Sequence, residues 1–482
     1  MSLSTAINSA TSGLRAVSRA AELVAGNIAN ASTPGYARRD VLLSANPLGG
    51  VSIDGFSRAT DPFLIADRRL SEAAYGSTRV LADGLGAIEG VIGDPTEEGS
   101  LLSRVARLET SLADAATRPD LESRLAEVRN AAADLTAGIA GISREIQEQR
   151  ALADTNIGTM VERLNESLKR VEDLNIEILR VGQKGVVATG LIEQRQQVID
   201  QITEIVPIRE VPRQDGQIAL FTDGGAVLLE GKAREIGFSP KGFVEPWMSL
   251  AGGALSGLTI GDTEIDTTAT RSLIGGGALQ ASFDMRDRVA PEAQASLDAL
   301  ARDLIERFQD PSLDPSLAVG DAGLFTDGGA AFDPLNEEGL SLRMELNSAV
   351  DPSNGGQLWR LRDGIGAIAE GPPGNNALLV ALTDRLGEAR VPATGPSAGQ
   401  SRSFEAQATA FLTGISSERQ WRESDLAFGA ARLEGTRTEE AIGGVDTDDE
   451  MQKLLLIEQN YGANARVLQT LDTLLEQLLS IT

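Results

Sequence analysis

The side chains able to do chemistry in this 482-residue sequence are few in kind, because it contains neither histidine nor cysteine. Their absence excludes Ser-His-Asp and Cys-His catalysis, disulfides, thiol nucleophiles and zinc sites built on those ligands. An enzyme made from this chain would depend on carboxylates, lysine, tyrosine or serine. The search for a catalytic site therefore starts from acidic clusters and glycine-rich loops.

One acidic cluster has the composition of a calcium loop. It comprises Asp310, Asp314, Asp321 and Asp327. An EF-hand loop needs a closing glutamate and a glycine in its middle, and these spacings supply neither. We therefore expect no metal site there.

Three glycine-rich segments are incomplete versions of known motifs. Gly275-Gly276-Gly277 is not followed by the Gly-Lys-Ser/Thr of a phosphate-binding loop. The segment 364–369 lacks the third glycine of a dinucleotide fingerprint, and 237–241 lacks the second glycine of a nucleophile elbow. We expect no catalytic residue, no cofactor and no metal, so the chain is not predicted to be an enzyme.

The composition of the chain argues against two kinds of binding partner. The formal net charge is −27 and aromatic residues make up 4% of the chain. Such a protein is repelled by phosphate and offers few rings for base stacking, so nucleic acid and anionic membrane are poor candidates. No apolar run approaches the roughly 18 residues of a membrane span, and residues 1–15 lack the pattern of a cleaved signal peptide. We expect no membrane insertion and synthesis in the cytosol, which leaves export by another route open.

A helix is predicted over about Ser4 to Ala29. Its apolar residues recur at steps of four and three, as in one strand of a coiled coil. They are Leu3, Ile7, Ala10, Leu14, Val17, Ala21, Val24 and Ile28. Pro34-Gly35 then fits the centre of a type II turn.

The other end of the chain has a matching pattern. Thr447 and Glu450 have the spacing of a capping box, which predicts a helix start after Gly443-Gly444. The apolar seam that follows contains Leu454, Ile457, Tyr461, Asn464, Leu468, Leu471, Leu475 and Leu478. A single asparagine in such a seam is typical of a residue that sets register or partner number.

Two interpretations of the terminal helices remain open. They are either ordinary amphipathic helices packed on a globular body, or coiled-coil strands that pair with each other or with neighbouring subunits. The narrow, regular seams and their position at both ends favour pairing. Opposite charge also favours it, since residues 1–40 are net +2 and residues 441–482 net −5.

Between the ends, the pattern changes twice. Between Pro119 and Pro207, apolar residues at helical spacing from Leu125 to Val181 predict one very long helix or two stacked helices. A turn is predicted at 182–185, and a further helix from Thr189 to Val206. Alternating apolar runs separated by glycine turns predict β-structure over 207–280. Helical spacing returns at about 290–308 and from 404 to 441, and 309–400 is rich in proline and glycine.

These patterns together predict a mainly α fold with an inserted β domain, elongated and multidomain, with a central bundle of long helices and terminal helices that form a coiled coil. The predicted domains are a terminal coiled-coil domain (1–40 and 443–482), a helical rod (41–206, 281–308 and 401–442), a β-rich insert (207–280) and a loop or second small module (309–400).

Both ends resemble a known family. Ser12-Gly13-Leu14, with Asn27-Ile28-Ala29-Asn30 and Thr33-Pro34-Gly35-Tyr36, is similar to the N-terminal signature of bacterial flagellar rod, hook and hook-associated proteins. Residues 445–468 resemble their C-terminal signature. The helix around 191–200 resembles a segment of the hook-associated members that rod and hook proteins are not expected to carry.

The resemblance implies a structural protein that assembles with itself in a ring or helical array at the distal end of the hook and joins hook to filament. It implies the hook protein and a second junction protein as partners, and an export chaperone on the C-terminal helix. It also implies type III export to the extracellular flagellum without a cleaved signal peptide, with subunit contacts through both terminal seams. Two alternatives stay open: another axial protein, such as hook or distal rod, and a carboxylate-dependent hydrolase with oligomerising coiled-coil ends.

Overall fold

A computed structural model describes residues 3–33, 36–47, 49–183, 188–269 and 271–480. Its helices are α1 (Leu3–Ala29), α2 (Pro62–Ile92), α3 (Leu101–Thr117), α4 (Glu122–Gly182), α5 (Thr189–Thr203), α6 (Gly277–Asp284), α7 (Ala290–Phe308), α8 (Leu340–Arg343), α9 (Arg360–Asp363), α10 (Ala377–Gly387), α11 (Phe404–Ile442) and α12 (Thr447–Ser480). Within the described residues, no helix combines the length and apolar character needed to cross a membrane.

The strands form small antiparallel sheets. They are β1 (Arg39–Ala45), β2 (Val51–Arg58), β3 (Ile208–Pro212), β4 (Ile218–Thr222), β5 (Val227–Glu230), β6 (Lys232–Ala233), β7 (Ile236–Gly237), β8 (Leu258–Ile260), β9 (Thr263–Ile265), β10 (Phe325–Asp327) and β11 (Met344–Leu346). The sheet orders are β1-β2, β3-β4-β5-β6, β7-β8-β9 and β10-β11.

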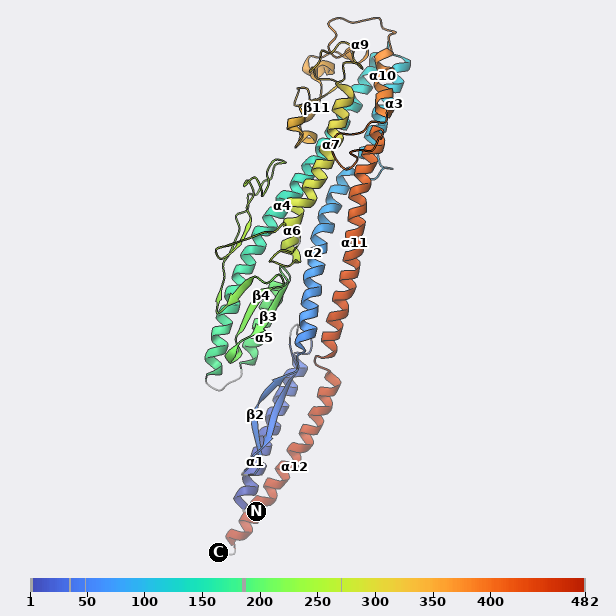
Figure 1. Cartoon of the computed structure of the whole chain (residues 1–482). Coiled ribbons are helices and arrows are strands. Elements are labelled where there is room, and N and C mark those ends of the chain that lie inside the picture. Colours follow the sequence, from blue (N-terminus) through green and yellow to red (C-terminus); the bar gives the residue numbers. More distant parts are fainter. Residues whose placement is uncertain (1–2, 34–35, 48, 184–187, 270, 481–482) are drawn as a thin grey trace.

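The molecule is elongated, with α2, α4, α7 and α11 running along a rod and both chain ends lying together at one tip (Figure 1). The 61 residues of α4 form one helix, about 90 Å long at the α-helical rise. The predicted mainly α fold with an inserted β domain is confirmed. Of the two options for 125–181, the single very long helix is correct. The further helix predicted from Thr189 is α5, and part of the turn predicted at 182–185 lies outside the described residues.

Local signals set where the long rod helices begin. Asp61 precedes Pro62, and its carboxylate accepts hydrogen bonds from the N–H groups of Phe63 and Leu64. Ser403 caps α11 in the same way, through the N–H of Ala406. The helix predicted at 290–308 starts earlier, because α6 runs from Gly277 through a π-helical turn at 285–289 into α7.

Two hydrophobic cores organise the rod. One fills its upper part between α2, α3, the first half of α4, α7 and α11, and takes in Leu313, Phe325 and Leu361 from the proline- and glycine-rich segment. This segment therefore packs on the rod and has no separate core. The other core packs the β-strands of 208–265 on α5 and on the stretch of α4 from Ile157 to Val171.

The sequence patterns did not predict the hairpin of β1 and β2. The hairpin contains a β-bulge between Leu42 and Leu43 and lies against α1 (Figure 1). Its strands stay close to the terminal helices, although the predicted boundary at residue 40 assigned most of it to the rod.

Candidate assembly interface

The terminal helices α1 and α12 pair within one chain. Residues of both predicted seams face the partner helix and are buried or half-buried there, as Val24, Leu14, Leu468 and Leu471 illustrate. Ile7, Val17, Ile28, Leu454, Ile457, Asn464 and Leu475 are half-buried as well, whereas Tyr461 is exposed. The side chains of Leu3 and Leu478, and the turn predicted at Pro34-Gly35, lie outside the described residues.

Two residues of the N-terminal signature explain how α12 and the β-hairpin pack on α1. A Cβ on Gly13 would stand 3.1 Å from the side-chain amide of Asn464, so glycine allows α12 to approach closely at its seam asparagine. Ser12 accepts a hydrogen bond of 3.1 Å from the N–H of Val51, which anchors the start of β2. The two residues thus hold a helix and a hairpin on one turn of α1.

Asn27 joins the base of the terminal domain. It is fully buried, and its side-chain nitrogen donates to Glu450 at 2.8 Å and to the carbonyl of Arg39 at 3.0 Å. Its side-chain oxygen accepts from the N–H of Arg39 and the hydroxyl of Tyr36. One asparagine therefore connects α1, the first turn of α12 and the start of β1.

The other polar signature residues act locally. The side chain of Asn30 donates to the carbonyl of Gly26 at 2.8 Å, which closes the last turn of α1, and Thr33 donates to Asn30. Burial raises the pKa of the Tyr36 hydroxyl above its ordinary value, against the opposing charge of Arg39 beneath the ring. Ala29 is exposed at the end of α1.

The predicted capping box at the start of α12 is wrong. Asp446, one residue earlier, accepts from the N–H groups of Asp448 and Asp449 and caps the helix. Glu450 is fully buried and points instead at Asn27 and Lys453. Glu450 bonds the distant Asn27 in place of its own helix start. A buried carboxylate needs hydrogen bonds, and the side chain of Asn27 donates one to it.

A second apolar row on α12 remains exposed. It contains Leu456, Val467 and Leu474, which lie beside the seam, and each exposes more than 40% of its surface. On a helix, residues seven or eleven apart share one side, so these residues form a flank next to the face that meets α1. The terminal pair therefore presents apolar surface that its own chain does not cover.

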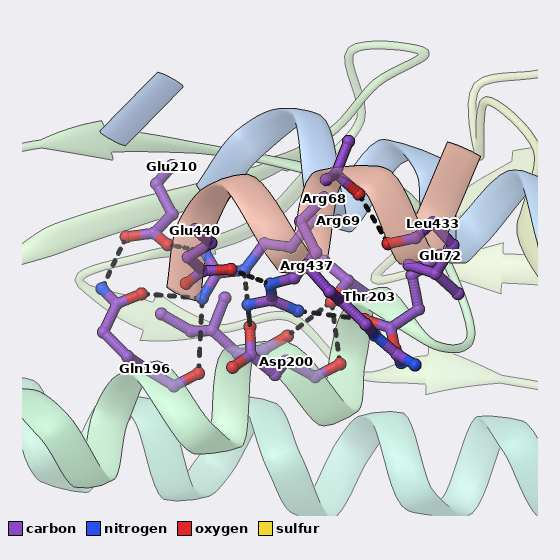
Figure 2. Close-up of polar contacts among 12 residues, drawn as sticks. Arg68, Arg69, Glu72, Gln196, Asp200, Thr203, Glu210, Leu433, Arg437 and Glu440 are labelled. Carbon is purple, nitrogen blue, oxygen red and sulfur yellow. Dashed lines mark hydrogen bonds and ion pairs between the residues drawn. The ribbon is translucent and has the colours of Figure 1, made fainter. Parts of the chain in front are cut away.

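Just above the terminal domain, paired arginines fix the insert to the rod (Figure 2). Arg68 of α2 donates to Asp200 of α5 at 2.8 Å and bonds Glu440 of α11. Its neighbour Arg69 is buried and contacts Asp200, Glu210 of β3 and Gln196. Burial on its own would lower the pKa of Arg68, but Asp200 and Glu440 raise it above its ordinary value.

One carboxylate connects the insert with the hairpin. Glu193 of α5 forms ion pairs with Arg39 and with Arg58, the latter at 3.6 Å. Burial lowers the pKa of Arg58, and Glu193 opposes that shift. Helix α5 thus contacts both the rod, through Asp200, and the terminal domain, through Glu193.

Sequence reasoning missed Glu450, Glu193, Arg68 and Arg69. Glu450 follows the predicted cap by three residues. Its spacing from Thr447 predicted a capping box, whereas its partners in the structure are Asn27 and Lys453. The other three stand at ordinary helical positions, where charged residues are usually solvated, and no spacing marks them.

No part of the described chain gathers three or more metal-ligating side chains. The acidic residues of 310–327 serve local structure: Asp310 accepts from the N–H of Ser312, and Asp314 from Ser316 and Ile365. A groove along α11 has one lining carboxylate, Glu405, so it does not supply the carboxylate pair of a glycosidase.

Comparison with known proteins agrees with this geometry. The family model for the flagella basal body rod protein matches residues 7–36, and that for the C-terminal part of the flagellar basal body rod FlgEFG protein matches 443–481. These are the two helices that pair here. They indicate the class of protein that the chain resembles, the axial proteins of the flagellum.

The middle of the chain shows which flagellar axial proteins it resembles most specifically. The family model for the helical domain of flagellar hook-associated protein FlgK matches residues 85–311. Flagellar hook-associated protein 1 of Bacillus subtilis is 23% identical over 98% of this chain and 97% of its own length. The protein of the same name from Escherichia coli is 23% identical over 99% of this chain and its full length. Over nearly its whole length, the chain is therefore similar to flagellar hook-associated proteins.

A solved structure is also similar, that of the flagellar hook junction protein FlgK from Burkholderia pseudomallei. It is 15% identical, with a TM-score of 0.42, over 55% of this chain and 47% of that one.

Proposed function

We propose that this protein is the non-enzymatic adapter that joins the flagellar hook to the filament. The observation that carries the proposal is the intramolecular pair of α1 and α12, whose family-signature residues contact each other at Gly13–Asn464 and Asn27–Glu450. A terminal pair held in this way, with a further apolar row exposed along α12, is a unit ready to pack beside identical units.

Copies would assemble through the terminal pair. The seam residues proposed for subunit contacts are Leu3, Ile7, Leu14, Val17, Val24, Ile28, Leu454, Ile457, Tyr461, Asn464, Leu468, Leu471, Leu475 and Leu478. Most of those described are only half-buried by the partner helix, so a neighbouring copy can cover the rest. Leu456, Val467 and Leu474 join this surface on the structural argument above.

The proposed partners follow from the position in the flagellum. The hook protein would contact one side of the ring and a second junction protein the other, while an export chaperone would hold α12 before assembly. The protein would leave the cell by flagellar type III export without a cleaved signal peptide. The β-strands of 208–265 lie on the rod above the paired ends, consistent with a domain that faces outward (Figure 1).

The test is to locate the tagged protein on isolated flagella. In cells whose only copy is tagged, we expect label at the junction between hook and filament, and at hook tips when filaments are sheared off. Cells lacking the gene should assemble hooks without filaments and release flagellin into the medium. Label along the hook, or in the rod below it, would instead identify another axial protein.

A further inference from the structure

A seam of small and aromatic residues runs along the side of α11 that faces away from α2. It contains Ala410, Thr413, Ser417, Trp421, Ser424 and Phe428, again at steps of three and four. Its upper part lines a groove of about 670 Å³, and below it Trp421 and Phe428 are 53% and 75% exposed. In a chain with 4% aromatic residues, two exposed rings on one helix face call for a partner.

A second apolar surface is held rigidly on the loop between β7 and β8. The buried guanidinium of Arg150 on α4 donates to the carbonyls of Glu245, Pro246 and Met248 in that loop. The loop presents Phe243 and Trp247, which are 62% and 64% exposed. Aromatic side chains on a pre-organised loop bind a partner with little loss of entropy.

The two surfaces lie at the same level of the rod. Ser143 and Gln147 of α4 donate to Gln294 of α7, and nine residues further along α7 Asp303 accepts from Gln407 of α11. Nine helical residues span about 13 Å, so the stretch of α4 near residue 145 is level with α11 near 416. By the same count, the loop held by Arg150 is level with Trp421 and the residues that follow it.

They also lie on opposite sides of the molecule, with α11 at one edge of the rod and the loop beyond α4 at the other (Figure 1). One copy cannot bring them together. In a ring, each copy turns one edge towards the opposite edge of the next, which is a head-to-tail contact between two different surfaces. A contact of the α11 seam with itself would be two-fold and would close a dimer without extending a ring.

We propose that Phe243 and Trp247 of one copy pack on the α11 seam of the next, which makes the rods a second line of contact outside the terminal helices. Charge agrees, since Lys241 beside the loop and Asp425 beside the seam form no ion pair within the described residues. The inference rests on the proposed function, because only assembly brings the copies side by side.

The test uses the absence of cysteine from the natural chain. Ser424→Cys is placed between the two rings of the seam and Glu245→Cys between the two rings of the loop. Cells produce both single-cysteine chains together, and their isolated flagella are treated with a short bis-maleimide linker. We expect a product that joins the two different chains, and none when either variant is present alone.

Each other result overturns the inference. A dimer from Ser424→Cys alone would show that the seam meets itself. Protein present at the hook tip without any cross-link would refute this contact and leave the proposed function intact, whereas absence of unmodified protein from the hook would refute both. As a second readout, Phe428→Asp should leave monomer melting unchanged, because the ring is exposed, and reduce incorporation into flagella at least tenfold.

Discussion

At the residue scale, the two signatures are explained by contacts between them. At Gly13, a Cβ would stand only 3.1 Å from the side-chain amide of Asn464, so a larger residue would crowd α12. Gly462, two residues earlier on α12, has no atom within 4 Å of the corresponding position. The two glycines therefore form a matched pair for substitution.

Gly13→Leu should separate α1 from α12. Leucine adds four carbon atoms where one already meets an amide, and overpacking of this kind costs about 1–3 kcal/mol. We expect amide hydrogens of both terminal helices to exchange faster. Gly462→Leu should leave exchange unchanged or slow it, since glycine in a helix costs about 1 kcal/mol. Equal rates of amide hydrogen exchange in the two variants would contradict the close approach of α12 to α1 at Gly13.

Asn27→Ala should open the base of the terminal domain. It leaves the buried Glu450 without one of its donors and the N–H of Arg39 without its acceptor, at a cost of about 1–3 kcal/mol each. Hydrogen exchange at the start of α12 and at β1 measures this opening. Asn8→Ala is the control, because Asn8 is exposed on the same helix. A loss no larger than that of the control would show that Asn27 does not join these elements.

At the element scale, buried charges attach the irregular parts to the rod. Arg69 holds α5 and β3 against α2 and is 5% exposed, whereas Arg79 on the same helix is 64% exposed. Breaking a buried ion pair typically costs about 3–5 kcal/mol, while exposed pairs contribute little.

Arg69→Met should therefore lower the urea midpoint at which the insert unfolds, followed by fluorescence of Trp247. Arg79→Met should leave that midpoint unchanged. An unchanged midpoint in both proteins would mean that Arg69 does not hold the insert on the rod.

The segment 309–400 should be held less firmly on the rod in acid. Burial on its own would raise the pKa of Asp351, but Arg129 and the N–H of Ser353 hold it below its ordinary value. The pKa of Asp363 is lowered in the same sense, by Arg362 and the N–H of Gly371 against the effect of burial. Because both folded-state pKa values lie below those of the unfolded chain, this stability is complete above about pH 4 and is lost as the pH falls further.

Fluorescence of Trp359 can follow that transition in a Trp247→Phe, Trp421→Phe protein. We expect a change below pH 4, moved towards higher pH by Arg129→Ala, which removes the partner of Asp351. A transition centred at pH 5 or above would contradict the assignment to these carboxylates.

At the scale of the whole molecule, one side of α12 packs on α1 in the monomer, and the flank beside it is free for contact with another copy. Leu471 is half-buried on the side that faces α1, whereas Leu474 is 44% exposed on the free flank. Leu474→Asp should leave hydrogen exchange of the monomer unchanged and prevent filament attachment, because a neighbouring copy would bury its charge at a cost of several kcal/mol. Leu471→Asp should speed hydrogen exchange in the monomer and also prevent filament attachment.

Flagellin released into the medium measures the assembly defect, and the amount of variant outside the cell checks export. Normal filaments on cells carrying only Leu474→Asp would exclude this flank from the subunit contact.

Local patterns in the sequence were sufficient for much of the fold. The seams of α1 and α12, the length of α4 and the β-strands after Pro207 depend on periodicity and turn residues, which act over a few positions. The absence of histidine and cysteine likewise excluded whole classes of chemistry.

The tertiary structure decided what each surface meets. It turned Glu450 from a helix cap to Asn27, placed an unpredicted hairpin on Ser12, gathered Arg68 and Arg69 around Asp200, and left one face of α11 uncovered. These outcomes depend on residues that are far apart in the chain. A side chain's own sequence neighbourhood records whether it is apolar or charged, but burial and hydrogen-bond partners are settled only when distant elements pack together.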